Sequence, residues 1–286
     1  MSFPTTLLLG AFAGLTIFAG LPLARIRLLD TRARVALAMF AVGVLAFLLV
    51  DVLGHAFETV EEAVEEFGEG EAGAGEALGL SALLLAGFAA GSAGLAAVEQ
   101  RLRRRRARPP IAGGAVDVLP ADARGAAVAD ETSRARSAAL SSAMTIAAAV
   151  GMHNFGEGLA MGVASSSGEM SLATALIVGF GLHNATEGFG IVGPLGAIRP
   201  SWKWLLGAGL VAGGPTVLGT AVGYSVNSEP LELAFYACAG GAIVYAIGEV
   251  WTAMRRHGHR VLGLALLAAG LSVGLLTELV VEYGGA

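Results

Sequence analysis

The sequence predicts an all-α membrane protein with eight transmembrane helices. Of its 286 residues 55% are hydrophobic, the mean hydropathy is +0.69, and apolar runs of about 20 residues, the length that spans a bilayer, recur along the chain. Only 14% of the residues are charged, against roughly 25% in soluble domains. A soluble fold could not hide so much apolar surface, whereas a bilayer removes the difficulty.

The eight apolar runs are the predicted spans. They cover residues 5–24, 34–57, 78–97, 138–164, 171–193, 203–225, 232–253 and 260–280. A signal peptide normally begins with basic residues, but no Lys or Arg precedes the first run. We therefore expect that run to be retained as a helix. A single transmembrane domain over residues 1–286 is expected.

The basic residues predict the orientation of these spans. All 18 Lys and Arg residues lie in or beside four alternate linkers, at residues 25–33, 98–137, 194–203 and 254–260. The positive-inside rule makes these linkers cytoplasmic, so both termini are expected outside the cytoplasm. The arginine-rich segment 98–137 is expected to be a flexible cytoplasmic loop that contacts lipid and not nucleic acid, because it adjoins a span.

The segment 58–77 has the opposite charge. It is expected to be an extracytoplasmic loop with eight glutamates and no basic residue: Glu58, Glu61, Glu62, Glu65, Glu66, Glu69, Glu71 and Glu76. Two interpretations remain open, a solvated loop or a surface that concentrates cations at a pore mouth. The single cysteine, Cys238, excludes an internal disulfide framework and a CxxC metal site.

The pattern HNxxEG occurs twice, on the predicted fourth and fifth spans. In each copy the His and the Glu are four residues apart, so both project from one face of the helix. Ionisable groups at bilayer depth are costly, about 2.5 kcal/mol or more for a central charge, and no basic residue lies within these two spans to pair with the glutamates. Imidazole and carboxylate ligands suit zinc and its divalent neighbours. The candidate metal ligands are His153, Asn154, Glu157, His183, Asn184 and Glu187.

Further polar residues are secondary candidates for an ion pathway. Asp51 and His55 lie four residues apart near the outer end of the second span, as an entry station or an interfacial pair. Glu249 lies near the inner end of the seventh span, as an exit ligand or as a partner of Arg255 or Arg256. The glycines around the motifs indicate either a loosened helix whose carbonyls help to coordinate the ion, or close helix packing.

The two motifs, together with the eight spans, resemble the ZIP (Zrt/Irt-like) metal transporters, in particular bacterial and GufA-like members, which often carry HNxPEG on both spans. The resemblance implies a transporter, whether carrier or channel, that moves zinc or another divalent transition metal, as its transported substrate, toward the cytoplasm. It also implies a 3+2+3 arrangement, with spans 1–3 and 6–8 as inverted repeats around spans 4 and 5, and a homodimer. A bacterial inner (plasma) membrane is the expected location.

This sequence departs from the family pattern at three positions. Gly156 and Thr186 stand where the family usually has proline, and Gly214 stands where many members have a glutamate before the proline of span six. The last departure favours one principal metal site over two. A metal sensor or receptor without transport and an intramembrane metallohydrolase remain alternatives, although the HExxH motif of metalloproteases is absent.

Overall fold

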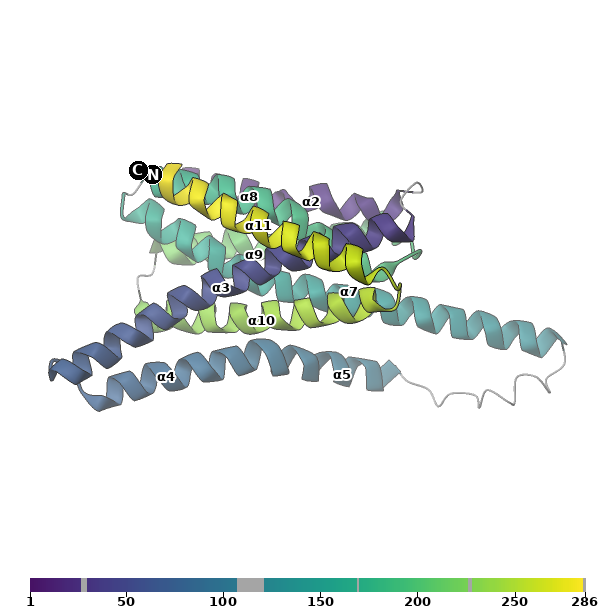
Figure 1. Cartoon of the computed structure of the whole chain (residues 1–286), viewed down its shortest axis with the longest axis horizontal. Coiled ribbons are helices and arrows are strands. Elements are labelled where there is room, and N and C mark those ends of the chain that lie inside the picture. The colour runs from purple at the N-terminus through teal and green to yellow at the C-terminus, as the bar shows by residue number, and fades with distance from the viewer. Residues whose placement is uncertain (27–29, 107–120, 169, 226–227, 285–286) are drawn as a thin grey trace.

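The computed structural model describes residues 1–26, 30–106, 121–168, 170–225 and 228–284. Within these residues the secondary structure is entirely helical, and long helices run side by side along one axis (Figure 1). The prediction of an all-α fold is confirmed.

Each predicted span lies in a helical segment. The first three segments are α1 (Phe3–Leu15), α2 (Ile17–Gly20) and the 3-10 turn η1 (Leu21–Arg25); α3 (Thr31–Glu69); and α4 (Ala74–Ala89), the π-helical turn η2 (Ala90–Gly94) and α5 (Leu95–Arg106). The motif helices are α7 (Ala121–Ser166) and α8 (Met170–Val192), followed by the turn η3 (Gly193–Leu195). The chain continues with α9 (Trp202–Ser225), α10 (Glu229–Arg255) and α11 (Arg260–Gly284).

Six of the described helical segments are long and apolar enough to cross a membrane: Phe3–Arg25, Thr31–Glu69, Ala74–Leu102, Trp202–Ser225, Glu229–Arg255 and Arg260–Leu279. The protein is therefore a multi-pass membrane protein. The motif helices α7 and α8 are not among the six.

The two segments predicted as charged loops are helical over most of their described length. Helix α3 continues through the acidic segment to Glu69 and α4 begins at Ala74, so residues 70–73 alone connect them. Alanine and glutamate are good helix formers, and Gly70, with a φ of 78°, ends α3 in the left-handed conformation that glycine favours. In the basic segment, residues 98–106 belong to α5 and 121–137 to α7, and residues 107–120 lie outside the described residues.

Close backbone contact fixes α9 against the motif helix α7. A Cβ atom built on Gly158 would lie 2.1 Å from the carbonyl oxygen of Thr216, and one on Gly219 would lie 2.0 Å from that of Phe155. Only glycine permits such an approach at these positions, as is common where membrane helices pack through small residues. Around this pair, α3 and α10 supply much of the apolar core, α11 packs on α3, and α4 packs on α10.

The two ends of the bundle differ in charge. Both termini and the turn between α3 and α4 lie at one end, whereas α5 ends and α10 meets α11 at the other (Figure 1). Three of the basic linkers contact one another. Arg25 donates a hydrogen bond to the carbonyl of Pro200 (2.5 Å), and Arg136 donates one to the carbonyl of Arg199 (2.8 Å).

Candidate metal centre

The HNxxEG motifs of α7 and α8 meet inside the bundle. All six candidate ligands are buried, and even the most accessible of them, His183, is only 9% exposed. The motifs lie within continuous helices, so the four-residue spacing holds each His and its Glu on one face. Gly156 and Thr186 stand at the two positions where the family usually has proline, and the helix continues unbroken through both.

Three of the six side chains form a compact cluster. One ligand atom each from His153, Glu157 and His183 lies within 4.8 Å of the other two. The Nε2 atom of His153 lies 2.9 Å from Oε1 of Glu157, and the Nε2 atom of His183 contacts the same oxygen. Glu187 lies just beyond, with its Oε1 atom 3.8 Å from Nε2 of His153.

The remaining polar atoms of the site have few hydrogen-bond partners. The side-chain oxygens of Asn154, Asn184 and Glu187, and Oε2 of Glu157, are buried without a hydrogen bond to any described residue. An unpaired buried acceptor costs about 1 to 3 kcal/mol, so buried acceptors without a protein donor need another partner. The carboxylates of Glu157 and Glu187 lie in or beside the His/Glu cluster, and a divalent cation bound there would give them a partner.

Each asparagine is fixed by its amide nitrogen. Nδ2 of Asn154 donates to the carbonyl of Ala212 on α9 (3.1 Å), and Nδ2 of Asn184 donates to the carbonyl of Ala13 on α1 (3.2 Å). The carbonyl of Ala13 also accepts hydrogen bonds from the backbone N–H and the hydroxyl of Thr16, where the first span departs from the regular helical pattern. The two amide oxygens have no hydrogen-bond partner among the described residues.

The glycines beside the ligands serve helix packing. A Cβ on Gly158 would strike the carbonyl of Thr216, and one on Gly188 would lie 2.7 Å from that of Ile17. Gly156 has more room, since its nearest neighbours are 3.8 Å away. Because the motif residues keep a continuous helix, close packing explains these glycines better than a loosened helix does.

The secondary candidates lie apart from the cluster. Asp51 is half-buried on α3 and interacts electrostatically with His153 and His183, whereas the side chain of His55 is 57% exposed and lies 3.9 Å from Glu58. Glu249 on α10 accepts a hydrogen bond from Ser142 on α7 (3.0 Å). Among the described residues, these three do not join the His/Glu group.

Sequence reasoning missed two features. The carbonyls of Ala13 and Ala212 hold the asparagines, and backbone groups leave no side-chain signal in a sequence. Glu99 on α5 is buried and accepts a hydrogen bond from Tyr245 (2.7 Å). A carboxylate this close to the end of the predicted third span was the sequence feature that could have indicated a buried polar contact.

Comparison with known proteins agrees with this geometry. A family model described as ZIP zinc transporter matches residues 95–248, which include both motif helices and most of α10. A search of curated proteins found no match. Because the family match covers more than half of the sequence, the chain belongs to the ZIP zinc transporter family.

Proposed function

We propose that the protein carries a divalent transition metal, zinc or a close neighbour, across the bilayer toward the cytoplasm through the site on α7 and α8. The observation that carries the proposal is the buried group of His153, Glu157 and His183 inside a multi-pass membrane protein of the ZIP family. A cluster of this kind is costly in a membrane unless an ion binds there.

The chemistry of the donor set supports a metal that binds and leaves. Imidazole nitrogens and carboxylate oxygens bind zinc and other first-row ions, and no described thiol belongs to the cluster. We propose that Glu187 and the free oxygens of Asn154 and Asn184 complete the ligand set. Neutral amide oxygens are weaker ligands than thiolates, which suits a site that must release its cargo.

We propose that all eight helical segments span the membrane, in a 3+2+3 arrangement. The even number of segments places both termini at one end of the bundle (Figure 1). The asparagine contacts support inverted repeats: Asn154 of the fourth segment binds the sixth, and Asn184 of the fifth binds the first. A two-fold axis that exchanges the two motif helices would also exchange α1 with α9.

The path to the site is proposed from the charged residues that flank it. The acidic end of α3 collects cations, Asp51 and His55 pass them inward, and Glu249 lies on the release side. The basic end of the bundle faces the cytoplasm of a bacterial inner membrane, and both termini lie outside it. A homodimer is expected from the family.

The test is the uptake of ⁶⁵Zn²⁺ by proteoliposomes. We expect saturable flux in the wild type and its loss in a His153→Ala/Glu187→Ala variant. The matched control, His257→Ala/Glu229→Ala, removes the same residue types at exposed positions away from the cluster and should transport normally. Tight zinc binding without flux would replace the carrier with a sensor, and flux that does not saturate would indicate a channel.

A further inference from the structure

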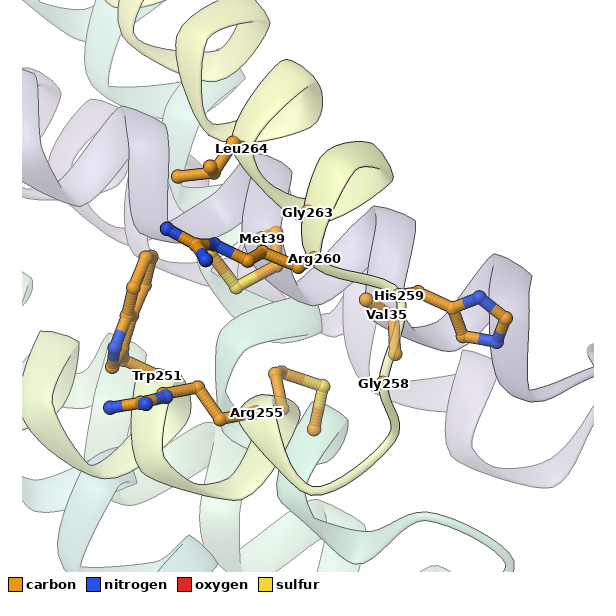
Figure 2. Close-up of a pocket in the computed structure, with 10 residues that line it drawn as sticks. Val35, Met39, Trp251, Arg255, Gly258, His259, Arg260, Gly263 and Leu264 are labelled. Atoms are coloured by element: carbon orange, nitrogen blue, oxygen red, sulfur yellow. The ribbon is translucent and has the colours of Figure 1, made fainter.

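A basic cavity lies where α10 turns into α11, at the end of the bundle away from the termini (Figure 2). Its volume is about 470 Å³. The side chains that define it come from α3, α10 and α11: Val35, Met39, Trp251, Arg255, Arg260 and Leu264. It is separate from the metal cluster, with which it shares no residue.

Two arginines give this cavity its charge. Figure 2 shows Arg255 on α10 and Arg260 on α11 extending to the same side, toward Trp251, whereas His259 points away from them. Among the described residues, no acidic side chain lines the cavity and neither arginine forms an ion pair. Guanidinium groups bind phosphate through paired hydrogen bonds, so two unpaired ones at one cavity form a site for a phosphate anion.

The other walls of the cavity are apolar. Val35 and Met39 of α3 are buried, and Leu264 of α11 is 45% exposed. Leu264 continues into the outer surface of α11, where large apolar side chains such as Val261 and Leu276 are exposed. In a membrane protein such a surface faces lipid tails, so the cavity opens toward the bilayer. A soluble phosphate would leave these walls without a partner.

The position of the cavity matches the level of lipid headgroups. It lies at the basic end of the bundle, where a span meets its linker, and tryptophan is enriched at this depth. The cytoplasmic leaflet holds the anionic phospholipids, and basic pockets between spans on that side bind their headgroups.

We propose that this cavity binds an anionic phospholipid. Arg255 and Arg260 hold its phosphate beside Trp251, and one acyl chain runs along Val35, Met39 and Leu264. The bound lipid fills the wedge between α10 and α11, both of which pack on α3, and so ties the last two spans together.

Native mass spectrometry of the purified protein in equal amounts of phosphatidylglycerol and phosphatidylcholine tests the proposal. We expect the wild type to retain phosphatidylglycerol preferentially. Two arginines near the membrane surface are together worth about a 30-fold change in affinity, so an Arg255→Gln/Arg260→Gln variant should lose that preference by about this factor. The control Arg256→Gln/Lys203→Gln removes two exposed charges from the same end, outside the cavity lining, and should keep the preference.

Three results would overturn the proposal: equal retention of both lipids by the wild type, equal losses in the two double variants, or displacement of the lipid by millimolar inorganic phosphate, which would indicate a site for a soluble anion. The first and third need only the wild type, so they decide the matter even if a variant fails to fold. Quenching of Trp251 by brominated phosphatidylglycerol, in a Trp202→Phe/Trp204→Phe background, gives an independent measurement. Quenching no stronger than that by brominated phosphatidylcholine contradicts the proposal.

Discussion

In Asn154 and Asn184 the two polar atoms of the side-chain amide have different surroundings. The amide nitrogen of each donates a hydrogen bond to a backbone carbonyl of a neighbouring helix, which fixes the side chain, and the amide oxygen is buried without a hydrogen bond to any described residue. An aspartate could not donate that hydrogen bond, and an alanine could neither donate it nor offer the oxygen. The helix contact and the proposed ligand atom thus belong to the same residue.

Replacing Asn184 with alanine should therefore weaken zinc binding by about 10- to 100-fold, the range found when groups that support metal ligands are removed. Thr186→Ala is the matched control, because the Thr186 hydroxyl on the same helix bonds only locally, to the carbonyl of His183 (2.7 Å). Competition with a zinc-binding dye measures both affinities. Equal affinities in the two variants would show that Asn184 is not part of the site.

At the residue scale, the sequence predicted which side chains would meet but not how closely. The repeated His–Glu spacing was sufficient to predict that α7 and α8 face each other. The separation of Glu187 from the tighter group of His153, Glu157 and His183 depends on the rotation and depth of each helix. Those are set by backbone contacts with α1 and α9, which side-chain patterns do not encode.

At the scale of the helices, the contact between α7 and α9 holds the site together. Glycines on both helices bring the two backbones into contact along several turns, and Ala212, the anchor of Asn154, lies on the same stretch of α9. A change that separates these helices should disturb the metal site as well as the fold.

A methyl group at Gly219 should destabilise the protein, because its Cβ would lie 2.0 Å from the carbonyl oxygen of Phe155. We expect a loss of about 2 kcal/mol in the free energy of unfolding, as for other overpacked interiors. Gly207 lies on the same helix with no atom within 4 Å of its Cβ position, so Gly207→Ala should be neutral or raise stability by up to about 1 kcal/mol. Thermal unfolding in detergent compares the two, and similar shifts would contradict the account.

The sequence predicted the existence of the helices better than their ends. Hydropathy marks the part of a helix that contacts lipid, but α3 continues beyond it through alanine and glutamate, and α7 begins in the basic segment. Both compositions favour helix in water, and hydropathy cannot detect where such a helix stops. The break at Thr16, in contrast, lies within an apolar run that looks uniform in sequence.

For the whole molecule, the division of charge predicts one orientation in the membrane. The eight glutamates near the α3–α4 turn lie toward one end and the arginines of α5, α10 and α11 toward the other. The sequence predicted this division because charge in the linkers follows directly from the positions of the spans.

Single cysteines test this orientation. With Cys238 replaced by serine, we expect Glu66→Cys to react with a membrane-impermeant maleimide on intact cells, and Arg256→Cys to react only after the membrane is permeabilised. Both positions are exposed, so access to the reagent depends on the side of the membrane alone. The reverse labelling pattern would invert the topology, and the proposed direction of transport with it.

The central claim is that His153, Glu157 and His183 bind the transported ion, and X-ray absorption at the zinc edge tests it most directly. For the zinc-loaded wild type we predict nitrogen and oxygen ligands at about 2.0–2.1 Å, with imidazole scattering from two histidines, and scattering from one in a His183→Ala variant. A spectrum without histidine scattering, or with sulfur at about 2.3 Å, would contradict the account.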